Sequence, residues 1–144
     1  MSASDFFRKV KASLHGLENR IASDVVAVEA ESFHAENFRK EGFTDVGFQK
    51  WQPRKKADKN SSHRALLVLS STLKGHALKG RVQGNSVVFN FPLEYMKVHN
   101  EGLHAGRGAG FEMPKRQFVG ESAYLEKKIE DKARRLMNQH LNNL

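Results

Sequence analysis

Apolar side chains recur every three to five positions in the N-terminal part of the chain. They are Phe7, Val10, Leu14, Leu17, Ile21, Val25, Val28 and Phe33. This spacing keeps them near one face of a helix, so it predicts a long amphipathic helix, or two in tandem, from Ser4 to about Lys40. Ser4 is the expected N-cap and Gly42 the expected stop, while Gly16 weakens the helix interior and marks a possible break.

The periodicity is lost between residues 42 and 65, in the sequence GFTDVGFQKWQPRKKADKNSSHRA. Its glycines, proline and many lysines predict a long exposed loop, and loops of this length are usually functional or disordered. Trp51 indicates that at least one point of the loop is anchored. We expect Trp51 to be buried as a plug against the core, with partner contact or base stacking as the alternative.

The clearest local pattern is LKGRVQGNSVVFNFP, residues 78–92. Two short runs flank Gly84 and Asn85, which predicts a β-hairpin with a tight turn, closed at its far end by Pro92. Before it, RALLVLSSTLKG predicts a short helix that residues 70–72 can cap. After it, LEYMKVHNEG predicts another short helix, stopped by Gly102.

The last third of the chain begins with four glycines between Gly102 and Gly110, which predict a flexible loop. KRQFVG then predicts one more short strand, and the apolar spacing from Ser122 onward predicts a C-terminal amphipathic helix. The order of elements indicates an α+β fold. In it, the long N-terminal helix and the C-terminal helix pack on a small antiparallel sheet that contains the β-hairpin.

A chain of 144 residues is normally one domain. We expect a single domain over residues 1–144, with an N-terminal helical region (1–41), a basic loop (42–65), a hairpin and small sheet (66–121) and a C-terminal helix (122–144). The chain has no cysteine, which fits a reducing compartment. Since no segment approaches the roughly 20 apolar residues of a membrane span, we expect a soluble, intracellular protein.

Positive charge is concentrated in one part of the chain. Residues 45–81 hold nine Lys/Arg against two Asp/Glu, a net charge of +7 out of +8 for the whole chain. The basic patch in the loop consists of Lys50, Arg54, Lys55, Lys56, Lys59 and Arg64. It is either a solvated loop or a surface for polyanions, which include DNA and acidic protein faces.

Catalytic and metal-binding patterns are absent from the sequence. The seven histidines form no i, i+4 pair with a glutamate, and no second cluster completes a triad. Ser70 and Ser71 lack the glycines of a nucleophile elbow, and no phosphate-loop lysine follows the Gly-rich segment. We therefore expect neither an enzyme nor a bound metal or cofactor.

Two motifs follow each other in the second half of the chain. The first consists of Tyr95, Val98-His99 and Gly102, and the second is a Pro-x-Arg-x-Phe-x-Gly motif formed by Pro114, Arg116, Phe118 and Gly120. Before them come Trp51 and Pro53 in a basic loop and a Leu-rich segment that ends at Leu73. This series resembles the phage virion morphogenesis family, which includes Mu-like prophage tail completion proteins and has a Tyr, Ile-His and Gly pattern at the first motif. The resemblance covers roughly residues 43 to 144.

The resemblance implies a structural role in virion assembly, at the tail terminus or the head-tail junction, without catalysis or a cofactor. It implies other tail or neck proteins as partners and a homo-oligomeric ring in the particle. The protein would act in the host bacterial cytoplasm and then remain in the virion. The basic segment would face the DNA channel or an acidic partner.

The motif residues have more than one possible role. We expect His99 to be packed or capping, with catalysis as the alternative, and Phe118 to lie in the core. Pro114 suits the first residue of an edge strand. Arg116 either projects to a neighbouring protein or pairs with a buried carboxylate.

Two other functions compete with virion assembly. One is a small nucleic-acid-binding protein that uses the loop of residues 50–64, with Trp51 stacking on bases. The other is a hydrolase or toxin-like enzyme with a spatially assembled site, for which His99 and Glu101 are the candidates.

Overall fold

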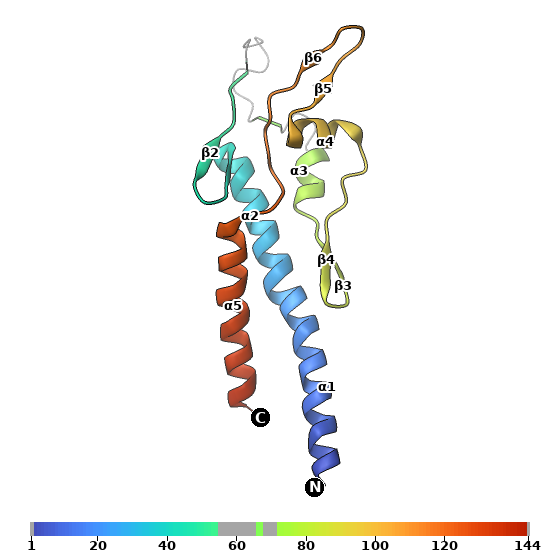
Figure 1. Ribbon diagram of the computed structural model, residues 1–144, viewed down its shortest axis with the longest axis vertical. Helices are drawn as coiled ribbons and strands as arrows, with labels where there is room; N and C mark the ends of the chain where they lie inside the picture. Colours follow the sequence, from blue (N-terminus) through green and yellow to red (C-terminus); the bar gives the residue numbers. More distant parts are fainter. Residues whose placement is uncertain (1, 55–65, 68–71, 144) are drawn as a thin grey trace.

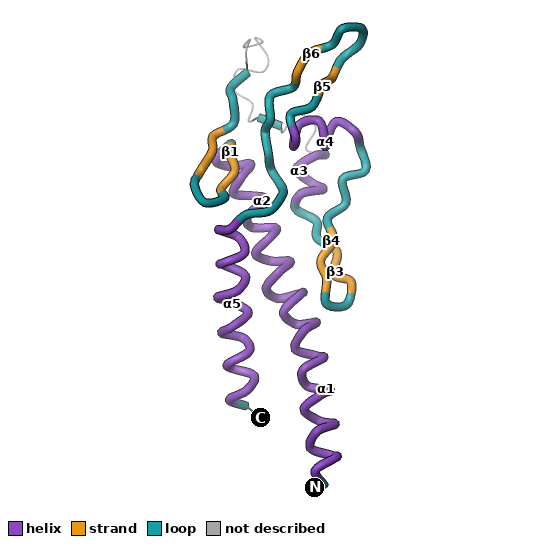
Figure 2. The backbone as a smooth tube through the Cα atoms, in the orientation of Figure 1, coloured by secondary structure: helices purple, strands orange, loops and turns teal. Residues whose placement is uncertain are grey.

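The structure, a computed structural model, describes residues 2–54, 66–67 and 72–143 of the chain. One long helix runs through most of its length, and the C-terminal helix lies beside it (Figure 1). The short helices and hairpins gather around the end opposite the two termini, with one hairpin reaching back along the long helix (Figure 2). The molecule is therefore a small core with a two-helix projection.

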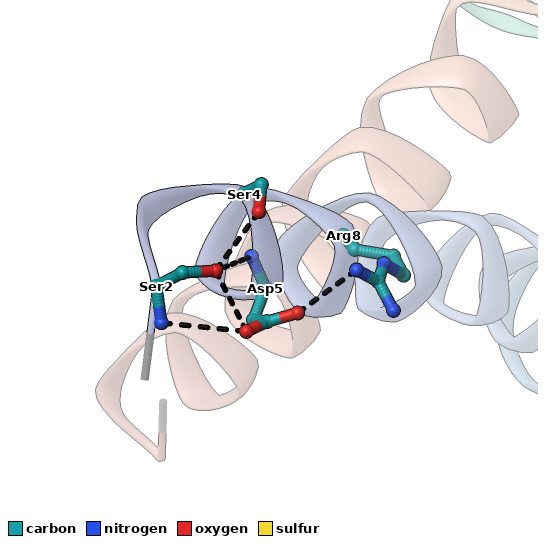
Figure 3. Close-up of polar contacts among 4 residues, drawn as sticks. All are labelled: Ser2, Ser4, Asp5 and Arg8. Carbon is teal, nitrogen blue, oxygen red and sulfur yellow. Dashed lines mark hydrogen bonds and ion pairs between the residues drawn. The ribbon is translucent and has the colours of Figure 1, made fainter.

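The long helix begins two residues earlier than the sequence indicates. The N-cap is Ser2, whose Oγ accepts a hydrogen bond from Asp5 N at 3.1 Å, while Asp5 Oδ2 accepts one from Ser2 N at 3.3 Å (Figure 3). This reciprocal capping box satisfies two of the donors that a helix N-terminus leaves unpaired. The prediction of Ser4 as the N-cap was wrong, because Ser4 lies inside the first turn.

The helix continues through three segments, α1 (Ala3–Ile21), a π-helical turn η1 (Ala22–Val26) and α2 (Ala27–Lys40). Gly16 does not break it, and the irregular turn lies at η1 instead. The helix ends with Glu41 in the left-handed region at φ 52°. Gly42 begins the next strand, where a Cβ would lie 2.3 Å from Phe48 Cζ, so the glycine serves a close approach rather than the helix stop.

The predicted loop of residues 42–65 starts with a hairpin, which corrects the prediction. β1 (Gly42–Thr44) pairs antiparallel with β2 (Phe48–Lys50), and Phe43 lies opposite Gln49. Phe43 enters the core at 5% exposure, whereas Phe48 remains half exposed. Residues 55–65 of the predicted loop lie outside the described residues.

The middle of the chain follows the prediction closely. α3 (Thr72–Ala77) comes before the hairpin of β3 (Arg81–Gln83) and β4 (Ser86–Val88). Of the predicted capping residues of α3, Ser70 and Ser71 lie outside the described residues. Gly84 takes the positive φ that the tight turn requires, at 60°. α4 (Glu94–Glu101) ends at Gly102, whose φ of 69° is the expected left-handed cap.

The Gly-rich segment forms a third hairpin, from β5 (His104–Ala105) and β6 (Phe111–Glu112). The strand predicted in KRQFVG does not form, since residues 113–118 have neither helix nor strand structure. The C-terminal helix α5 (Ala123–Asn142) starts as predicted, and Ser122 Oγ caps it by accepting from Leu125 N at 3.1 Å.

The α+β fold is confirmed, with the described strands arranged as three separate antiparallel pairs. The core lies where α2, α3 and α4 meet the chain segments around Trp51 and Phe118. Its buried members are Phe38, Trp51, Leu66, Leu73, Ala77, Met96 and Phe118. By contrast, α5 has no buried residue and lies beside the long helix as a mostly exposed helix.

Candidate functional site

The Pro-x-Arg-x-Phe-x-Gly motif forms one extended stretch, residues 114–120, which we call the motif segment. It crosses the core between α4 and the chain around Trp51. Arg116 N donates to His99 O at 2.8 Å, and Gln117 O accepts from Trp51 Nε1 at 2.8 Å. The segment therefore joins both sequence motifs and the tryptophan in one place.

Two asparagine side chains replace the strand partner that the motif segment lacks. Asn100 Oδ1 accepts from Phe118 N at 2.9 Å and from Val119 N at 3.1 Å, and Asn37 Nδ2 donates to Phe118 O at 3.1 Å. These bonds satisfy backbone groups that a sheet would otherwise pair. The strand prediction failed because two helices, α2 and α4, supply those partners.

Arg116 bonds the backbone, and no carboxylate among the described residues forms an ion pair with it, while its predicted contact with a neighbouring protein stays a prediction. Its side chain is buried, at 9% exposure, and donates from Nε to Gln52 O at 3.0 Å and from Nη2 to Pro53 O at 3.4 Å. Burial lowers the pKa of Arg116, and the charge of Arg54 adds to this, while the Glu41 carboxylate opposes it. Arg116 therefore holds the chain that leads into the basic loop.

Trp51 is a core plug, as predicted. Its ring is 4% exposed and meets Phe38 edge to face at a centroid distance of 5.6 Å. Phe118 is 1% exposed and packs on the same phenylalanine at 5.5 Å. Since Trp51 lies under the surface, base stacking by this ring would require the core to open.

His99 is half-buried at the end of α4. Its Nδ1 is buried and has no hydrogen-bond partner among the described residues. Burial lowers the pKa of His99, and the nearby Arg116 charge lowers it further. The Tyr95 ring meets it edge to face at 6.4 Å and is itself 41% exposed. Glu101, the other catalytic candidate, is exposed on the same helix.

The small motif residues fit the chain path. A Cβ on Gly102 would lie 2.7 Å from Lys115 Cβ, so the glycine lets α4 and the motif segment approach closely. Gly120 has φ 144°, a conformation that side chains rarely adopt. Pro114 follows β6 in extended chain, so its predicted place at the start of an edge strand was wrong.

Sequence reasoning missed the residues that tie these parts together. Asn37 and Asn100 were not singled out, although Asn37 is a polar position beside apolar Phe38 on the buried face of α2. Asp45 was also missed: its Oδ1 accepts from Ala123 N at 2.8 Å and helps to start α5. Asn37 is a polar residue within an apolar stripe, and this position could have indicated that its side chain bonds a buried backbone group.

The basic patch is only partly described. Lys50 is exposed on β2 and Arg54 is half-buried, while Lys55, Lys56, Lys59 and Arg64 lie outside the described residues. A second cationic surface lies beside the β3–β4 hairpin, in a groove of about 600 Å³. It is lined by His76, Lys79, Gly80, Arg81, Gln83, Val88 and Asn90.

The described residues hold no group of three or more His, Cys, Asp or Glu side chains that could bind a metal ion. Among the helices in the described ranges, none combines the length and apolar character that crossing a membrane requires.

The motif segment has a positional role in this structure. Its contacts set the places of the chain around Trp51, of α4 and of the start of α5.

Comparison with known proteins gives a family but no individual relative. Neither the curated proteins nor the solved structures contain a match to this chain. The model of the phage virion morphogenesis family matches residues 3–138, which adds the long N-terminal helix to the region that carries the motifs. The family acts with other virion proteins in particle assembly. The chain therefore belongs to the phage virion morphogenesis family.

Proposed function

We propose that the chain is a tail completion protein, which acts at the tail terminus or the head-tail junction by binding and geometry rather than by catalysis. The observation that carries this proposal is the motif segment. Its bonds to Asn37, Trp51, His99 and Asn100 make one rigid core out of segments far apart in the sequence. Rigid placement of exposed elements is what a connector between virion parts needs.

The exposed elements are the hairpins. Val46 at the β1–β2 turn is 92% exposed, Phe48 is 48% exposed, and Phe111 on β6 is 54% exposed. Apolar side chains on exposed hairpins mark surfaces for protein contact, and unpaired strand edges can accept another chain. We place contacts with tail or neck proteins at these hairpins.

A homo-oligomeric ring in the particle is part of the proposal. A head-to-tail contact between different surfaces of neighbouring copies generates a closed ring when the rotation from one copy to the next closes. The groove between α2, the β1–β2 hairpin and α5 offers one such surface, with a volume of about 570 Å³ and lined in part by Phe33, Phe48 and Tyr124. The protein would act in the host bacterial cytoplasm during assembly and then remain in the virion.

The test is electron microscopy of particles from an induced lysogen that lacks the gene. We expect filled heads and separate tails, and joined virions when the wild-type gene is supplied. Phe111→Asp should fail to restore joining, whereas Leu93→Asp, a similar exposed change outside the hairpins, should restore it. Normal, infectious particles from the deletion would overturn the proposal.

DNA contact is a second candidate function, favoured by the cationic groove. Residues 72–92 hold Lys74, Lys79 and Arg81 and no acidic residue. Binding of a short DNA duplex, followed by fluorescence anisotropy, should weaken steeply with salt because each neutralised phosphate releases counterions. Lys79→Glu with Arg81→Glu should weaken binding, and Arg107→Glu, far from the groove in sequence, should not. Binding without salt dependence would exclude this function.

A further inference from the structure

The N-terminal part of the long helix carries an apolar stripe on its surface. Phe7 is 68% exposed and Leu14 is 45% exposed, and Val10 between them is half-buried. Together with Lys11, His15 and Glu18 they line a groove of about 520 Å³ on α1. Nothing in the described part of the chain covers it.

The stripe continues a face that is buried further along the same helix. Steps of three or four residues lead from Phe7 through Leu14 to Ala22 and Val25, which are 2% and 6% exposed. There, β4 of the β3–β4 hairpin packs against η1. In Figure 1 this hairpin covers only the upper part of the helix, and α1 runs on beyond its tip. The exposed stripe therefore continues a helix face that is buried further along, but no element in the described part of the chain packs on it here.

Opposite charges flank the centre of the stripe. Lys11 and Glu18 line the same groove, seven residues apart, which on a helix is two turns or about 10.5 Å. Leu14 lies between them. This arrangement is complementary to itself when a second α1 runs in the opposite direction, because each Lys11 then faces the Glu18 of the second copy.

The same charges disfavour other arrangements of two copies. In a parallel pair, Lys11 would face Lys11 and Glu18 would face Glu18, and like charges across an interface are costly. An antiparallel pair forms both favourable contacts at once, because a twofold contact uses the same patch on both copies. A twofold axis near Leu14 that pairs Lys11 with Glu18 places the stretch from Lys11 to Glu18 of one copy against the same stretch of the other, and two helices that cross at an angle touch mainly at that crossing.

We propose that a second copy of this chain occupies the groove, with the two α1 helices antiparallel across a twofold axis near Leu14. The pairing covers the centre of the apolar stripe, around Leu14, from water. It does not rest on the proposed place of the protein in the tail, and it uses a surface separate from the hairpins. The capping box at Ser2 and Asp5 holds the start of the helix in place for this contact (Figure 3).

The test is sedimentation equilibrium of the full chain over a range of concentrations. Wild-type protein should form a reversible dimer. Lys11→Glu and Glu18→Lys should each weaken dimerisation by about tenfold or more, because each places two like-charge contacts in the interface. A mixture of the two single variants, and the double variant Lys11→Glu/Glu18→Lys, should both return to wild-type association.

Lys9→Glu is the matched control, since Lys9 is exposed on the same helix but does not line the groove. It should leave dimerisation unchanged. Leu14→Asp should give a monomer, with circular dichroism as the check that the helix still forms. A wild-type chain that stays monomeric, single variants that associate normally, or a mixture that does not recover association would each overturn the proposal.

Discussion

The core end of the molecule and the two-helix projection are held together in different ways. At the core end, aromatic rings and the motif segment are almost fully buried, and asparagine side chains satisfy the backbone. In the projection, formed by α1 and α5, Leu17 is the buried residue of α1 and α5 has none. Burial is therefore concentrated at one end of the molecule, while the side chains at the other end are mostly exposed.

Polar contacts hold α5 against the long helix. Glu29 on α2 is 4% exposed, and it forms an ion pair with Lys132 and a longer one of 3.8 Å with Lys128, both on α5. Ser13 on α1 bonds His140 near the end of α5. Because little apolar area is buried there, we expect the projection to open at lower free energy than the core.

The largest effect should come from the core itself. Phe118→Ala removes a ring that is 1% exposed and should lower the free energy of unfolding by about 3 to 5 kcal/mol. Phe7→Ala, the matched change on the projection, should cost no more than about 0.5 kcal/mol in the monomer because that ring is already in water. Urea denaturation measures both. Equal losses would show that the two ends do not differ as described.

The ion pair between α2 and α5 should give the next largest effect. Lys128→Met with Lys132→Met leaves the buried Glu29 carboxylate without these partners and should cost about 2 kcal/mol, less than for a fully buried pair because the lysines are half exposed. Amide hydrogen exchange should speed up in α5 and remain slow in the core. Lys127→Met is the control on the same helix, and it should leave exchange in α5 unchanged.

A smaller loss should follow from Asn100→Ala, which leaves Phe118 N and Val119 N without their acceptor. Because the site is only partly buried, these two unsatisfied donors should cost about 1 to 2 kcal/mol in the free energy of unfolding. Asn100→Asp keeps a side-chain oxygen at the same place and should lose less. If both variants unfold at the same urea concentration, the bonds to Phe118 and Val119 do not contribute as described.

The smallest effect is a pH dependence from histidines at the core end of the molecule, whose pKa values burial lowers. His34 is 5% exposed and its Nδ1 lies 2.7 Å from Ala77 O, so the neutral ring donates there, and burial lowers its pKa below 6.5. Below pH 6.5 the unfolded chain then binds a proton that the folded chain does not, so stability falls as pH falls. His99, whose pKa is also lowered, acts in the same direction.

Melting temperatures at pH 7.5 and 5.5 measure this dependence, with a lower value expected at pH 5.5. His34→Gln removes the titrating group and should reduce the difference, whatever its effect on stability at neutral pH. A difference that His34→Gln does not alter would assign the pH dependence to other groups.

Local rules predicted the elements with strong local patterns. The β3–β4 turn at Gly84, the end of α4 at Gly102 and the start of α5 at Ser122 all lie where turn and cap residues indicated. The β1–β2 hairpin was missed because its strands are short and one carries an exposed Phe48, so alternation gave no indication. The strand in the motif segment was predicted because its local pattern fits a strand, although the segment does not pair with another strand in the structure.

Sequence patterns were sufficient to predict the α+β fold, the long amphipathic helix, the burial of Trp51 and Phe118, and the motifs that mark the family. These features depend on local periodicity, on caps and on residue types that burial favours. The bonds of Arg116 to backbone carbonyls, and those by which Asn37 and Asn100 hold the motif segment, became visible only in the folded chain. The reason is that these bonds join residues between 18 and 81 positions apart, and the sequence does not specify which distant groups the folded core brings within hydrogen-bond distance.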